Sequence, residues 1–141
     1  MEDAELAIVL IGSTAGTCKV AIDEIRKQGK KVGLVKIRVF RPFPAEELAQ
    51  VLSKCKAVAV LDRSEGFSAC GGPLGAETRS ACYDLENRPK MVNIVYGLGG
   101  RDCSVEDTER VFAHLEHIVE TGELGSRYLH MGQRDLREEV L

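Results

Sequence analysis

The residues best suited to chemistry stand in LDRSEGFSACGGPLGAE, residues 61–77, which combines two serines, a cysteine and several glycines. This stretch could place a nucleophile on a sharp turn, cradle a phosphate, or simply connect a strand to a helix. Its GFSAC segment departs from the GxSxG nucleophile elbow at the last position, and Ser68 lies six residues past Asp62, where the preceding strand should end. Asp102 and His114 follow in triad order, but 141 residues leave little room for a hydrolase fold. Cys70 has only a helix start nearby to activate its thiol. We therefore expect no catalytic residue in this stretch.

A second candidate is GSTAGTCK, residues 12–19, which superficially resembles a phosphate-binding loop. Only three residues separate Gly12 from Gly16, and Lys19 stands three positions after Gly16, where a P-loop has its lysine directly after the glycine. The segment does not match GxGxxG either. A helix start with serine and threonine hydroxyls can still attract an anion. We expect a capped helix start here, with an anion site as the alternative.

Metal ligands are sparse. His114 and His117 stand three apart in a predicted helix, and the obvious further ligands are Cys103 and His130. A structural zinc site needs four well-placed ligands. The five cysteines form no CxxC pair, which disfavours an iron–sulfur cluster bound by this chain and fits a reducing compartment. No metal is expected.

The segments that must position these residues alternate regularly. Continuous apolar stretches predict strands, and amphipathic stretches between them predict helices. The predicted strands are residues 5–13, 31–40, 56–62 and 91–97, and the predicted helices are residues 14–30, 45–54, 73–85 and 104–122. Such alternation is typical of a mostly parallel sheet covered on both sides. We predict one α/β domain over residues 1–122, a three-layer α/β/α sandwich whose mostly parallel or mixed sheet has four to five strands. Residues 123–141 are polar and weakly periodic, so they are predicted to be a tail that docks on a partner or frays.

Composition excludes two classes of partner. The net charge is −3 and there is no basic block and no tryptophan, which argues against nucleic-acid binding. No apolar run approaches the ~20 residues that a membrane helix needs, and the start lacks a basic region typical of a signal peptide. We expect a cytoplasmic protein.

Three segments in order carry a family resemblance: VGLVKIRVFRPFPAEEL, AVAVLDRSEGFSACGGPLGAE and VNIVYGLGGRD. Together they resemble the second core domain of 2-oxoacid:ferredoxin oxidoreductases, which forms the C-terminal part of the pyruvate synthase α subunit and is similar to the transketolase C-terminal domain. The resemblance covers roughly residues 5–121. The loop RSEGFSACGGPL departs from relatives that have a shorter polar turn with FG before the glycines.

The resemblance implies a non-catalytic role for this chain. The whole enzymes oxidatively decarboxylate a 2-oxoacid, most often pyruvate, using thiamine diphosphate and Mg²⁺. They pass electrons through [4Fe–4S] clusters to ferredoxin or flavodoxin and the acyl group to coenzyme A. In that family other domains bind these cofactors. The resemblance therefore implies an assembly domain that packs against other domains and subunits, and is either cut from a larger subunit or encoded separately.

Under this hypothesis the loops after the strands form an interface. The candidate interface positions are Arg41, Asp62, Arg63, Ser64, Gly71, Gly72, Gly99 and Arg101. The alternative is a free-standing module that binds a nucleotide or another anion with the same loops, because ligands of doubly wound folds lie at the carboxyl ends of the strands.

Overall fold

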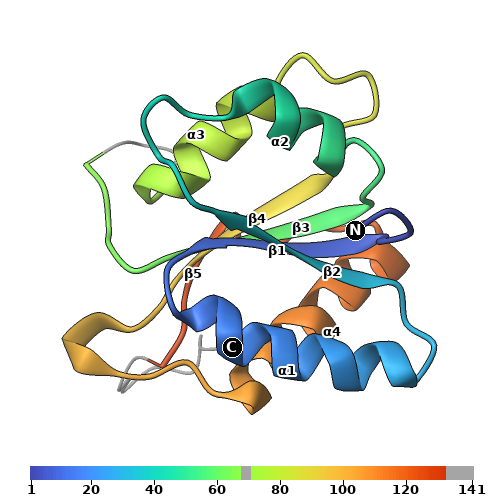
Figure 1. Ribbon diagram of the computed structural model, residues 1–141. Helices are drawn as coiled ribbons and strands as arrows, with labels where there is room; N and C mark the ends of the chain where they lie inside the picture. Colours follow the sequence, from blue (N-terminus) through green and yellow to red (C-terminus); the bar gives the residue numbers. More distant parts are fainter. Residues whose placement is uncertain (68–70, 133–141) are drawn as a thin grey trace.

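The computed structural model describes residues 1–67 and 71–132 (Figure 1). It contains one five-stranded sheet in the order β2-β1-β3-β4-β5, and every paired neighbour is parallel. The strands are β1 (Leu6–Ile11), β2 (Val32–Ile37), β3 (Ala57–Asp62), β4 (Lys90–Val95) and β5 (Tyr128–His130). The helices are α1 (Thr14–Lys27), α2 (Ala45–Leu52), α3 (Pro73–Cys82) and α4 (Val105–Thr121), with a short 3₁₀ turn η1 (Leu98–Gly100). The expected α/β fold is confirmed, and the sheet is parallel throughout.

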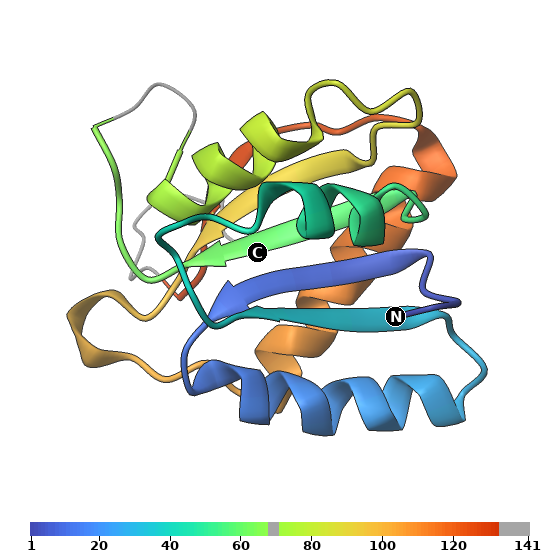
Figure 2. The ribbon, with the colours of Figure 1, turned by 45° about the horizontal axis from the view of Figure 1, so that its top comes forward.

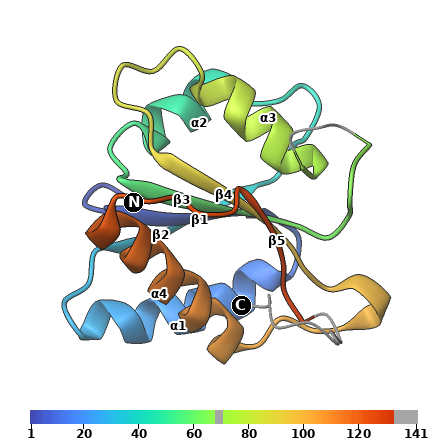
Figure 3. The same ribbon diagram turned by 180° about the vertical axis from the view of Figure 1, so that it is seen from behind.

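The helices form two layers around the sheet. Helices α1 and α4 cover one face, and α2 and α3 cover the other, as the views from front and back show (Figures 1 and 3). Strand β1 alternates between the two cores. Leu6, Ile8 and Leu10 pack in the core beside α1 and α4, whereas Ala7 and Val9 pack in the core beside α2 and α3. An apolar residue at every position of such a strand reflects burial on both sides.

The last helix begins where its sequence indicated. The Ser104 side chain accepts a hydrogen bond from the backbone N–H of Asp107, and the Asp107 carboxylate accepts one from the Ser104 backbone, which forms a capping box. Helix α4 ends at Gly122, whose φ of +75° suits a residue without a Cβ. Within the described residues, none of the helices combines the length and apolar character needed to cross a bilayer.

Strand β5 falls inside the segment that the sequence set apart as a tail. It pairs in register with β4, with Asn93 opposite Tyr128 and Val95 opposite His130. Part of the segment therefore extends the sheet of this chain, and residues 133–141 lie outside the described residues. Because all five strands are parallel, their carboxyl ends meet at one edge, which lies at the left in Figure 2.

Candidate interface at the carboxyl edge of the sheet

The loop after β3 is held by the last residue of that strand, Asp62. Its side chain is buried, with only 6% of the residue exposed. One carboxylate oxygen accepts the backbone N–H of Leu74 and the other accepts that of Gly75, each at 2.9 Å. These N–H groups belong to the first turn of α3, where unpaired donors and the positive end of the helix dipole favour an anion. Asp62 thus fastens β3 to the start of α3.

Asn93 in the middle of β4 completes this network. It is fully buried. Its Nδ2 donates to the carbonyl oxygen of Val60 at 2.9 Å and to the Asp62 carboxylate at 2.8 Å, and its Oδ1 accepts the Gly72 N–H at 2.8 Å. Both donors and the acceptor of the amide are occupied, as burial requires. Asn93 is not among the positions predicted from the sequence, although it is a lone amide in the apolar stretch MVNIVYG.

Three glycines let this network close. A Cβ on Gly72 would lie 2.5 Å from Asp62 Cγ, and a Cβ on Gly75 would lie 2.5 Å from Asn93 Cγ. Gly71 has a φ of +104° and would clash with Asn93 as well. The backbone must therefore approach both side chains more closely than any other residue type allows. Asp62, Gly71 and Gly72 support the loop from inside.

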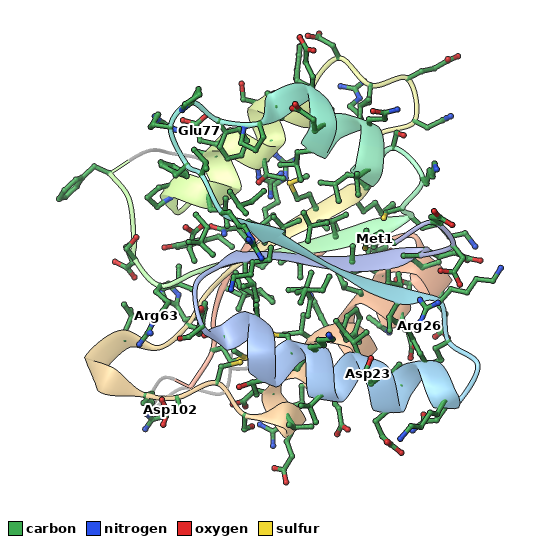
Figure 4. The ribbon with its side chains drawn as sticks, in the orientation of Figure 1. Met1, Asp23, Arg26, Arg63, Glu77 and Asp102 are labelled. Atoms are coloured by element: carbon green, nitrogen blue, oxygen red, sulfur yellow. The ribbon has the colours of Figure 1, made fainter. Side chains whose placement is uncertain are left out.

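The three predicted arginines lie exposed at this edge. Arg63 follows β3 directly, and its guanidinium carbon is 5.9 Å from the centroid of the Tyr96 ring (Figure 4). Arg101 follows η1 and donates to the carbonyl oxygen of Gly132. Each guanidinium presents several donors, so further donors can pair with carboxylates of another chain.

Arg41 occupies a separate place on the same edge. Its Nη2 donates to Glu77 Oε1 of α3 at 2.6 Å, and its guanidinium carbon lies 4.2 Å from the Phe40 ring centroid. Both side chains remain partly open to solvent, so the contribution of this ion pair to stability is small. Arg41 joins the loop after β2 to α3.

Apolar side chains stand exposed among these polar ones. Phe67, in the loop after β3, is fully exposed, and Leu98, in η1, is 42% exposed. Ser64 and Gly99 of the predicted positions are exposed beside them. Exposed aromatic and arginine side chains in one region are typical of protein–protein interfaces.

A hollow of about 550 Å³ also opens at this edge, between η1 and β5. Leu98, Arg101 and His130 contribute to its lining. The His130 ring contacts the carboxylate of Glu65. Arg101 and His130 could attract an anion here, as the alternative function of an anion-binding module requires.

The start of α1 was expected to be capped by a serine or threonine side chain, with an anion site as the alternative. Ser13 stands at the N-cap without a side-chain hydrogen bond to the helix. Thr14 Oγ1 instead accepts the hydroxyl of buried Tyr96 at 3.0 Å. The expected serine or threonine cap is therefore wrong, because Tyr96 engages the neighbouring threonine and Ser13 adopts a helical backbone.

The remaining chemical candidates are not brought together. His114 lies on α4 with its Nε2 buried and without a hydrogen-bond partner, and burial together with nearby His117 lowers its pKa. In the described part of the chain, no group of three or more histidine, cysteine or acidic side chains could hold a metal ion. Ser68 and Cys70 lie outside the described residues.

Comparisons with known proteins agree with the architecture. The ketoisovalerate oxidoreductase subunit VorA of Pyrococcus horikoshii is 43% identical over 124 residues, which are 88% of this chain and 31% of that protein. The pyruvate synthase subunit PorA of Thermotoga maritima is 42% identical over 135 residues, which are 96% of this chain and 33% of that protein. The chain thus spans about a third of the length of these relatives.

The fold is also similar to that of a solved structure. This structure is the 2-oxoglutarate:ferredoxin oxidoreductase from Magnetococcus marinus, with 2-oxoglutarate, coenzyme A and succinyl-CoA bound, at 22% identity and a TM-score of 0.56. The match covers 79% of this chain and 18% of that one. The family model described as pyruvate:ferredoxin oxidoreductase core domain II matches residues 4–108. The chain belongs to the pyruvate:ferredoxin oxidoreductase core domain II family.

Proposed function

We propose that this chain is the assembly domain of a 2-oxoacid:ferredoxin oxidoreductase and supplies no catalytic residue. The observation that carries this proposal is that the two buried polar side chains at the carboxyl edge, where ligands of α/β folds bind, are already hydrogen-bonded within the chain. The Asp62 carboxylate already accepts three hydrogen bonds, and the Asn93 amide makes three. A general base or metal ligand needs a free lone pair aimed at its substrate. These two side chains instead stabilise the loop that carries Arg63.

The complete enzyme would oxidatively decarboxylate a 2-oxoacid, most often pyruvate, to an acyl-CoA and reduce ferredoxin or flavodoxin. That chemistry requires thiamine diphosphate, Mg²⁺ and [4Fe–4S] clusters. The described residues do not fit a metal ion or an iron–sulfur cluster, since they gather no set of three or more potential metal ligands. We therefore assign the cofactors to other domains of the enzyme.

The proposal assigns the edge loops to contacts with those domains. Arg63 and Arg101 are exposed in this chain, and arginine tolerates partial desolvation because its planar fork pairs with a carboxylate through two hydrogen bonds. Exposed Phe67 and Leu98 would supply apolar area to the same contact. Ordinary solvent-exposed loops need neither feature.

Charge reversal at this edge tests the proposal. Arg63→Glu and Arg101→Glu should each weaken association with the other subunits by about 2–5 kcal/mol. The new glutamate cannot pair with a carboxylate of the other subunit and repels it. Arg88→Glu is the matched control, since Arg88 is exposed in the loop before β4, at the opposite edge. Association is measured by titration calorimetry or sedimentation. Equal affinities for all three variants and the parent would contradict the interface.

The rival function is an anion pocket, and the hollow beside Arg101 is the observation that favours it. Calorimetric titration of the 141-residue chain with coenzyme A and common nucleotides separates the two. The assembly proposal predicts no detectable heat. Micromolar binding that Arg101→Glu abolishes would replace the assembly domain with a binding module.

A further inference from the structure

Two cysteines far apart in the sequence meet between α1 and the start of α4. Cys18 lies on α1 and is fully buried, whereas Cys103 precedes the N-cap of α4 and is partly exposed. Both sulfur atoms approach the same hydroxyl, Thr108 Oγ1, at 3.5 Å from Cys18 and 4.0 Å from Cys103. Cys103 also packs against the core cluster that contains Cys18. Neither cysteine has a part in the function proposed above.

The surroundings of the pair favour ionisation of one thiol. Thr108 Oγ1 also lies 3.1 Å from the carbonyl oxygen of Ser104 and donates to it, which fixes the hydroxyl beside both sulfurs. Hydrogen bonding between the thiols lowers the pKa of Cys18 to about 7 and raises that of Cys103. The pair therefore gives up its first proton readily, and the second is held tightly.

Other buried cysteines of this chain behave in the opposite way. Burial raises the pKa of the Cys55 thiol to about 11, and burial also raises that of Cys82. Thiols whose pKa is raised by burial are inert, whereas paired thiols with one ionised member react as nucleophiles. The contrast singles out the pair beside Thr108.

We propose that Cys18 and Cys103 form a redox-active dithiol that closes to a disulfide by exchange with low-molecular-weight disulfides. The Cys18 thiolate accepts the proton of the partly exposed Cys103 thiol. The Cys103 thiolate then attacks one sulfur of the small disulfide, which forms a mixed disulfide and releases one thiolate that takes this proton from Cys18. The Cys18 thiolate then attacks the Cys103 sulfur, forms the internal disulfide and releases the second thiolate. The two protons of the dithiol leave with the two released thiols, so one small disulfide is reduced for each dithiol oxidised.

The bond would tie α1 to the residue that precedes the capping box of α4. Cys103 also ends the segment that begins with η1 and contains Arg101. Oxidation would therefore fix one end of this edge loop to the helix layer beneath it.

Exchange with oxidised glutathione tests the proposal on the full chain. After incubation at neutral pH, free thiols are alkylated in denaturant and the peptides are mapped by mass spectrometry. The parent and Cys70→Ala should both give one cross-linked pair that contains Cys18 and Cys103, without bound glutathione. In Cys103→Ser, Cys18 should remain alkylated. Cys55→Ala is the matched control and should leave the cross-link unchanged.

Two results would overturn the dithiol. In the first, Cys103 retains glutathione as a stable mixed disulfide while Cys18 is recovered alkylated. In the second, Cys18 and Cys103 are alkylated to the same extent as Cys55 after glutathione treatment. Circular dichroism of Cys103→Ser confirms that the comparison is made on folded protein.

Discussion

Replacing Asp62 with alanine removes the acceptor at the centre of the loop network. The carboxylate accepts from the backbone N–H groups of Leu74 and Gly75 and from Asn93 Nδ2, at 2.8–2.9 Å. Each buried donor left without a partner costs about 1–3 kcal/mol, and water entering the space offsets part of this. We therefore expect Asp62→Ala to lower the free energy of unfolding by about 3–5 kcal/mol, a large share of the total for a domain of this size.

Urea unfolding of the 141-residue chain, followed by far-ultraviolet circular dichroism, measures this loss. Asp62→Asn should fall between the parent and alanine, because the amide keeps one acceptor oxygen but turns its own donors toward the donors of the network. Asp102→Ala, exposed at the same edge, should change stability by no more than about 0.5 kcal/mol. A loss below about 1 kcal/mol for Asp62→Ala would refute the central role of this carboxylate.

Two further predictions concern Gly75 and His114. Gly75→Ala should destabilise the chain by about 1–3 kcal/mol, because its Cβ would lie 2.5 Å from Asn93 Cγ. Gly16→Ala is the control: the space around its Cβ is open, so it should stabilise α1 by about 0.5–1 kcal/mol. Equal urea midpoints for the two variants would contradict this prediction. Burial lowers the pKa of His114 from its ordinary 6.5, so the unfolded chain binds this proton more tightly and stability should fall as the pH drops below that value. His114→Leu should flatten this dependence in urea midpoints taken between about pH 7.5 and about pH 5, and an unchanged slope would exclude His114 as its source.

The fold was predictable because the first four strands repeat the same local pattern. Continuous apolar stretches of six residues separated by amphipathic helices allow few arrangements other than a covered parallel sheet. Strand β5 escaped this reasoning because Tyr128–His130 is short and only half-buried. Its position depends on backbone pairing with β4, which leaves little trace in a side-chain pattern.

The candidate site was predictable only in its exposed part. Arg63 and Arg101 could be assigned to the edge because each follows a strand directly or within a short turn. The link between Asp62 and Asn93 spans two strands, so no local spacing reveals it. The contact of Cys18 and Cys103 at Thr108 likewise depends on how α1 packs beside α4.

The most direct test of the account is the turnover of the assembled oxidoreductase with single alanine substitutions at Ser68, Cys70 and His114. The measured quantity is the rate of coenzyme A-dependent 2-oxoacid oxidation per assembled complex, with assembly checked by sedimentation. If this domain contributes no catalytic residue, each variant should stay within about tenfold of the parent, or ~1.4 kcal/mol in the activation barrier. A loss of about a thousandfold at Ser68 or Cys70, with assembly intact, would place a catalytic residue in this chain and contradict the account.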